Sequence, residues 1–229
     1  MITKAASAIR NLVRDTSGVA MTEFALAFPF ILGVGLMGLE TANRALIEMQ
    51  VSQLAMQIAD NGSRIGEAGV LEDRKIYEDD INDLFYGAHI QSGKGIDIFT
   101  HGRVIMSSLQ VDKDTGEQYI HWQRCAGTLA HTSQYGTVDG ARSDVAAGMG
   151  PADAKVMAFD EAAVIFVEIA YTYQPLIGDP FTFGEQDVSA IASYIVRDDR
   201  DLSGIYQRDT NAPDPVASCD QFGGSFYDL

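Results

Sequence analysis

The longest apolar stretch of the chain runs from Val19 to Leu39, and its only charged residue is Glu23. As a helix, these 21 residues span about 31 Å, which matches the ~30 Å hydrocarbon core of a bilayer. A cleaved secretory signal has a shorter apolar core of about 7–15 residues and a clear small-residue cleavage site, which the exit of this stretch lacks. A buried core helix would be amphipathic. The pattern therefore predicts a retained transmembrane helix over 19–39.

Beyond Leu39 the apolar positions become one-sided, which predicts that the same helix continues outside the membrane. The segment Glu40–Ile58 contains neither Gly nor Pro, and Asn61-Gly62 is a plausible end. A helical spacing of three or four, with Gln53 as one polar break, relates Leu39, Ala42, Leu46, Met49, Gln53 and Met56, and the apolar stripe is widened by Leu54 and Ile58. A helical extension over 40–62 is typical of pilins, but a simple juxtamembrane stalk would have the same pattern.

A second helix is expected over about 70–87. One face carries Tyr77, Ile81 and Phe85, and the other is acidic, with Glu78, Asp79, Asp80 and Asp83. The spacing of these carboxylates matches no ordered cation-binding loop, so we interpret them as a solvated helix face.

The pattern then changes to that of β-strands. Val104–Val111 and Gln118–Cys125 flank a turn and predict a hairpin. That turn, Asp112-x-Asp114-x-Gly116, resembles the start of a calcium loop but lacks the later ligands, so no metal is expected there.

Ala162–Tyr173 is almost continuously apolar, which predicts a central strand. Its Glu168 needs a partner if it faces inward and none if it faces solvent. Pro175 and Asp179-Pro180 should end this strand, and Val188–Arg197 should form the last one. From Asp198 onward an irregular surface tail is expected, on account of its turn residues Pro213, Pro215, Gly223 and Gly224. The fold class is thus α+β: a long N-terminal membrane-spanning helix, then an extracytoplasmic domain with an antiparallel sheet packed on helix.

Charge sets the expected topology. The chain holds 16 basic and 32 acidic residues, for a net charge of −16. Residues 1–18 carry Lys4, Arg10 and Arg14 against Asp15, so this leader is basic and the rest of the chain is strongly acidic. The positive-inside rule then places the N-terminus in the cytoplasm and the C-terminal domain in the periplasm. So acidic a domain would be repelled by phosphate backbones, which argues against nucleic-acid binding.

Glu23 is the most informative residue of the apolar span. A carboxylate costs roughly 2.5–3.5 kcal/mol at the bilayer centre and less near an end, so Glu23 could simply extend toward the headgroups. Alternatively, a cut between Gly18 and Val19 would create an α-amino group four residues before Glu23. Positions four apart share a helix face, so the amine could neutralise the carboxylate within one chain or between neighbouring subunits.

Two other features of the span concern the helix itself. Pro29 lacks a backbone donor, so a kink or local unwinding is expected there. Gly33-Val-Gly35-Leu-Met-Gly38 spells G-x-G-x-x-G, but it has no preceding strand and lies inside an apolar span. We interpret these glycines as small residues that help helices pack.

The segment Gly18-Val-Ala-Met-Thr-Glu23-Phe-Ala-Leu-Ala-Phe-Pro29 resembles the N-terminal signature of TadE-like proteins, which are pilin-like components of the tight-adherence (Tad) type IV pilus system. The resemblance implies processing after Gly18 by a prepilin peptidase, with Glu23 at the fifth mature position. Thr22 departs from the Val that many relatives carry. Tyr119–Cys125, Val167–Leu176 and Ile195–Arg197 look like recurring blocks of TadE-like periplasmic domains.

Cys125 and Cys219 are the only cysteines, and both fall on the side assigned to the periplasm, where disulfides persist. A bond between them would tie the tail back to the hairpin, and two buried free thiols are the alternative. No catalytic signature occurs: His89, His101, His121 and His131 lack zinc spacing, and there is no nucleophile elbow or phosphate-binding loop. We therefore expect no enzyme, no cofactor and no metal.

Two functions remain in competition. The first is a minor pilin or pseudopilin-like subunit of Tad pilus assembly and surface adhesion, whose partners are inner-membrane lipid, other assembly subunits and a prepilin peptidase. The second is an uncleaved single-pass membrane protein whose acidic periplasmic module, over 63–229, binds a partner. An enzyme is a distant third.

Overall fold

The computed structural model describes residues 17–67, 73–177, 187–196 and 199–222. They belong to two compact units, which are described separately below. The first comprises residues up to Arg44 together with Pro175–Gly184, and the second holds the remainder. Residues 1–16 of the basic leader, the turn at Asp179-Pro180 and the glycines at 223 and 224 lie outside the described residues.

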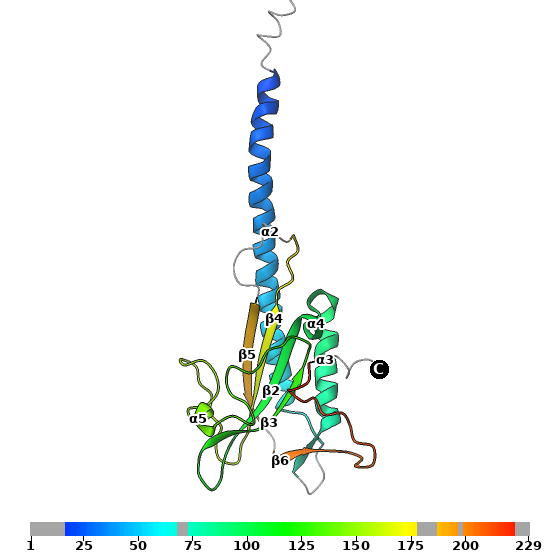
Figure 1. Cartoon of the computed structure of the whole chain (residues 1–229), viewed down its shortest axis with the longest axis vertical. Coiled ribbons are helices and arrows are strands. Elements are labelled where there is room, and N and C mark those ends of the chain that lie inside the picture. The colour runs from blue at the N-terminus through cyan, green and yellow to red at the C-terminus, as the bar shows by residue number, and fades with distance from the viewer. Residues whose placement is uncertain (1–16, 68–72, 178–186, 197–198, 223–229) are drawn as a thin grey trace, which may run out of the picture. The chain divides into compact units, whose positions relative to one another are not determined.

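One helix, α2, runs from Ser17 to Gly62 (Figure 1). It passes through Pro29 as a single helix and ends at the Asn61-Gly62 stop predicted from the sequence. The expected continuation of the apolar helix over 40–62 is therefore confirmed. A kink at Pro29 stays a prediction.

The second unit contains a four-stranded antiparallel sheet of order β3-β2-β4-β5. Its strands are β2 (Gly102–Val111), β3 (Gln118–Ala126), β4 (Val164–Thr172) and β5 (Asp187–Ile195). The predicted hairpin and the predicted central strand are both confirmed, and β4 is buried along eight of its nine residues. Such burial explains why its sequence is apolar almost without alternation.

The buried side chains of this unit form two hydrophobic clusters. The larger one includes Val51, Leu54 and Ile58 from α2 and Phe85 from the next long helix, together with strand residues such as Val167. The smaller one contains Leu109, Ile120, Val145, Met149, Ala158, Val164 and Phe166. In the second cluster the ring of Tyr135 packs edge-on against Phe166, with centroids 5.4 Å apart. The long loop between β3 and β4 thus contributes core residues.

The predicted second helix is wrong at both boundaries. Arg74–Tyr77 form a strand, β1, and the helix α3 follows it from Glu78 to Ile96. Tyr77 is extended and donates its backbone N–H to Asp80 Oδ2 at 3.0 Å, so Asp80 fixes the start of α3. At its other end Gly87 does not stop the helix, and the backbone first leaves helical geometry at Gly93, with φ 62°.

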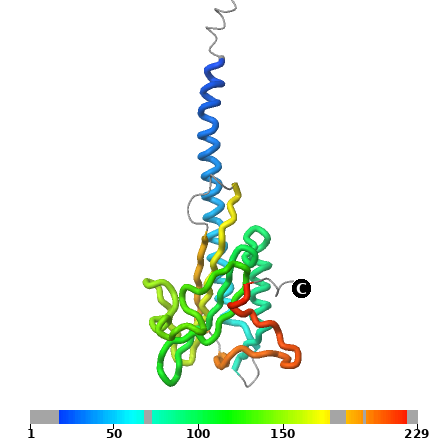
Figure 2. Tube along the Cα trace, in the orientation of Figure 1, coloured from blue at the N-terminus to red at the C-terminus, as the bar shows by residue number. Residues whose placement is uncertain are grey.

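The expectation of an irregular tail from Asp198 is also wrong in part. Arg200–Tyr206 form β6, which pairs in parallel with β1 in a separate two-stranded sheet. The two strands are short and polar, and they lie more than 120 positions apart. Neither strand therefore carries a local sequence signal of the pairing. After β6 the chain is irregular, and Figure 2 shows it returning, in orange and red, to the green segment that contains β3. Two short helices, α4 (Ile98–His101) and α5 (Arg142–Val145), complete the unit.

Candidate functional site

The apolar start of α2 exposes nearly all its large side chains. Phe24 is 60% exposed, Phe30 75% and Val34 73%, and no residue of its most apolar window is buried within the chain. Of the described residues, α2 is the one helix long and apolar enough to cross a membrane. Water is a poor solvent for such a surface, whereas lipid covers it without cost.

The residues of the predicted processing junction lie in the first described turns of this helix. Gly18, Val19 and Glu23 are all exposed. The Thr22 hydroxyl donates to the Val19 carbonyl oxygen at 2.8 Å. The polar group that Thr22 adds beside Glu23 is therefore hydrogen-bonded within the helix. Val19 and Glu23 are one helical turn apart on a continuous helix, as the charge-pairing hypothesis requires.

A second carboxylate on α2 was missed by sequence reasoning. Glu40 follows the apolar span directly and is only 4% exposed. Its two oxygens accept the backbone N–H groups of Leu176, at 3.2 Å, and Ile177, at 3.0 Å. All three residues belong to the first unit. The acceptor and its donors are more than 130 positions apart in sequence, so no local pattern could have paired them.

The predicted disulfide is confirmed. Cys125 in β3 is bonded to Cys219 in the tail, 94 positions later, and the Cys125 N–H donates to the Ala217 carbonyl oxygen at 2.8 Å. Cys125 is 3% exposed. Without the disulfide, its thiol would therefore be buried as a small apolar group.

Arg103 in β2 holds the same tail through carbonyl oxygens. Its guanidinium donates to Gly127 O and Gln221 O, each at 2.7 Å, and to Cys219 O at 2.8 Å. It also lies 4.4 Å from the centre of the Phe222 ring. Burial lowers the pKa of Arg103, and the Asp220 carboxylate acts in the opposite direction. The tail is thus fixed by a covalent bond and a buried cation together.

Glu168 faces inward on β4, 3% exposed, and it has the partners that an inward carboxylate requires. His131 Nε2 lies 3.0 Å from its Oε1, Ser133 Oγ donates at 2.9 Å, and the Gln134 N–H donates to both oxygens at 3.2 Å. The serine hydroxyl bonds to the carboxylate and not to the imidazole, so this group lacks the serine–histidine bond of a nucleophilic triad. Its visible effect is to fix the β3–β4 loop on the sheet.

Three of the four acidic residues that the sequence analysis named at the start of α3 are paired with arginines of the chain. Glu78 bonds to Arg124, and Asp79 and Asp80 both bond to Arg208. The hydrogen bonds that Arg208 donates, first to Asp79 and second to Glu67, raise the pKa of Arg208 above its usual value. In the hairpin turn, a hydrogen bond from Arg142 and then the Asp114 N–H lower the pKa of Asp112. Across the described ranges, no three or more His, Cys, Asp or Glu side chains are grouped to hold a metal ion.

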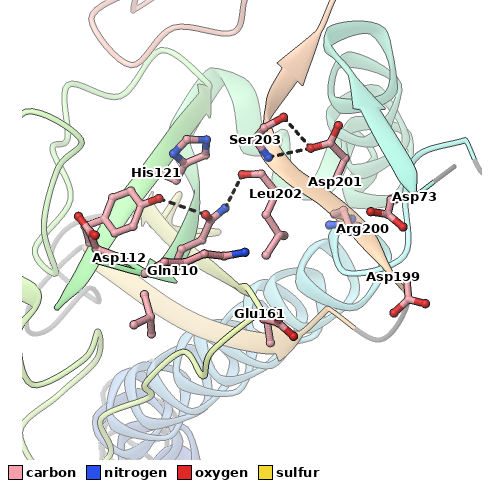
Figure 3. Close-up of a pocket in the computed structure, with 14 residues that line it drawn as sticks. Asp73, Gln110, Asp112, His121, Glu161, Asp199, Arg200, Asp201, Leu202 and Ser203 are labelled. Atoms are coloured by element: carbon pink, nitrogen blue, oxygen red, sulfur yellow. Dashed lines mark hydrogen bonds between the residues drawn. The ribbon is translucent and has the colours of Figure 1, made fainter. Parts of the chain in front are cut away.

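Figure 3 shows an open cavity between β2 and β6, of about 710 Å³. Tyr119 donates to Gln110 Oε1 at 3.3 Å, and Gln110 donates to Leu202 O at 3.4 Å, so its polar wall is hydrogen-bonded internally. The Ser203 and Tyr206 hydroxyls lower the pKa of Asp201 by donating to its carboxylate. The outer wall is acidic, with Asp73, Glu161 and Asp199.

Comparison of the chain with protein-family models, with curated proteins and with solved structures found no match.

Breaking the disulfide should loosen the tail and destabilise the second unit. We expect the double variant Cys125→Ser, Cys219→Ser to lose about 2–4 kcal/mol of unfolding free energy. Urea denaturation of the detergent-solubilised full chain, followed by the emission of the single Trp122, measures it. Reductant should destabilise the native chain similarly and leave the double variant unchanged. An unaltered urea midpoint in the double variant would contradict this role.

Removing the Glu168 carboxylate should leave the Ser133 hydroxyl, the Gln134 N–H and the His131 ring without their partner. Glu168→Leu should therefore cost about 3 kcal/mol, and Glu168→Gln, which keeps one acceptor oxygen, should cost less. The same Trp122 assay measures both. The exposed Asp153→Asn serves as the control and should change stability by less than about 0.5 kcal/mol. Equal stability of Glu168→Leu and the native chain would show that the cluster is dispensable.

Proposed function

We propose that this chain is a membrane-anchored, minor pilin or pseudopilin-like subunit that takes part in the assembly of a Tad-type pilus and in surface adhesion. The observation that carries the proposal is the arrangement at the start of α2. A Gly-Val junction and a carboxylate one turn later lie exposed at the beginning of a long, lipid-compatible helix. The resemblance of this segment to the TadE-like signature supports interpreting the Gly-Val pair as a processing junction and the carboxylate as its partner in assembly.

In the proposed topology, residues 1–18 are the cytoplasmic leader, 19–39 cross the inner membrane, and the sheet domain packs on the helical extension in the periplasm. The basic leader and acidic remainder favour this orientation. The Cys125–Cys219 disulfide supports an oxidising compartment for the domain, because cytosolic thiols are kept reduced.

The proposed mechanism uses the membrane helix twice, as anchor and as assembly surface. A prepilin peptidase cuts after Gly18 and creates an α-amino group on Val19. This cation neutralises Glu23, in the same chain or in the next subunit, and so sets the axial register of neighbouring helices. Exposed aromatic side chains such as Phe24 and Phe28, whose rings stack at 5.3 Å, provide apolar surface for the same contact.

The alternative is an uncleaved anchor whose acidic domain recruits a partner. The acidic wall of the cavity in Figure 3 favours a basic partner in that case. The two functions differ at the N-terminus, where the first requires processing and the second does not.

Processing should be visible as a new N-terminus. When the full chain is co-expressed with a cognate prepilin peptidase, we expect the membrane-extracted protein to begin at Val19, as determined by N-terminal sequencing. A catalytically inactive peptidase is the control and should leave Met1 in place. A product that keeps Met1 beside an active peptidase that cuts its own major pilin would remove the pilin-like mechanism and favour the uncleaved module.

Loss of the Glu23 carboxylate should separate processing from assembly. Glu23→Ala should still be cut after Gly18 but should reduce piliation to the level of a strain lacking the protein, because the Val19 amine loses its partner. Glu48→Ala, which removes an exposed carboxylate further along α2, is the matched control and should pilate normally. Normal pilus numbers from Glu23→Ala would refute charge pairing.

A further inference from the structure

The buried Glu40 carboxylate fixes a chain segment beside the membrane end of α2. Both of its oxygens are used, one by the Leu176 N–H and one by the Ile177 N–H. Leu36, one turn earlier on the same face, is half-buried, whereas Leu39 is 52% exposed. The segment therefore lies against one face of the helix, at the point where the apolar span stops.

The side chain beside these hydrogen bonds is apolar and faces outward. Leu176 is 63% exposed, and Pro175 beside it is exposed too. An isolated exposed leucine is ordinary on a protein surface. This leucine, however, is held by its own backbone N–H to Glu40, the residue that directly follows the apolar span.

Glu40 also removes the usual obstacle to placing a loop at a membrane boundary. Backbone N–H groups in a water-poor environment cost several kcal/mol each unless they are hydrogen-bonded, so loops normally stay outside. Here the N–H groups that flank the Leu176 side chain already have an acceptor. The acceptor is itself buried against the segment, and residues 175–177 carry no charge.

We propose that Pro175–Ile177 form a second membrane contact, in which Glu40 holds the backbone and Leu176 inserts into the outer headgroup and upper acyl region of the lipid. This inference rests on the proposed membrane anchoring by α2. The contact fixes how deeply α2 sits and limits its rotation, because the inserted residue lies on one face of the helix.

Tryptophan substitutions in the full chain test the contact. The protein is reconstituted into phosphatidylethanolamine–phosphatidylglycerol vesicles that carry a nitroxide either in the headgroup region or deep in the acyl chain. Leu176→Trp should lose more than about half of its added emission to the headgroup label and much less to the deep label, as an interfacial Trp does. Emission of the native chain, from Trp122 alone, is subtracted.

Two further substitutions calibrate the result. Phe159→Trp replaces a side chain with the same 63% exposure in the second unit and should be quenched by neither label. Phe28→Trp reports the anchor itself and should be quenched by the deep label. If Phe28→Trp is quenched but Leu176→Trp behaves like Phe159→Trp, the second contact is refuted and the anchor stands. If Phe28→Trp is not quenched, both proposals fail.

The role of Glu40 is tested in the Leu176→Trp chain. Adding Glu40→Ala should abolish the headgroup quenching, and Glu40→Gln, which keeps one acceptor oxygen, should preserve part of it. Glu48→Ala is the matched control and should change nothing. Unchanged Trp122 emission shows that the second unit stays folded. Full quenching in Glu40→Ala would show that the segment reaches the lipid without this carboxylate.

Discussion

The structure depends on α2 serving two different surroundings along its length. For its first turns the helix is apolar on every side, and its large side chains are exposed. From Val51 onward, successive turns bury residues such as Leu54 and Ile58 in a protein core. Apart from the donor that Pro29 lacks, a continuous helix pairs the backbone groups of its interior within itself, so the same helix is stable in lipid and against a domain. The proposed anchoring and the proposed assembly surface both rely on this continuity.

Glu40, Glu168 and Arg103 are among the charged side chains that are buried in the described residues, and each of the three is matched by groups of opposite polarity. Glu40 accepts two backbone N–H groups, Glu168 is contacted by three residues of one loop, and Arg103 donates to three carbonyl oxygens. Each group fixes an irregular segment to a helix or a strand. The chain thus uses buried charges, rather than further secondary structure, to give its loops a defined position.

Local patterns in the sequence were enough to predict the long helix, the hairpin and the central strand. Each has a strong periodic or continuous apolar signal, and Asn61-Gly62 marked the helix end correctly. The strands Arg74–Tyr77 and Arg200–Tyr206 were missed because their pairing joins segments more than 120 positions apart. The Glu40 contact was missed for the same reason: its partners are backbone groups, which have no sequence signature. Cys125 and Cys219 could be paired because the chain holds no other cysteine.

The position of the disulfide has a mechanical consequence. Tension applied between α2 and the chain beyond Cys219 reaches Cys125 in β3 and then crosses the sulfur–sulfur bond directly. The residues between the two cysteines, which include β4, β5 and β6, are therefore outside the load path. Such a chain can carry force through its helix and hairpin while the central strand, with Glu168 and the loop that this carboxylate holds, stays outside the covalent path.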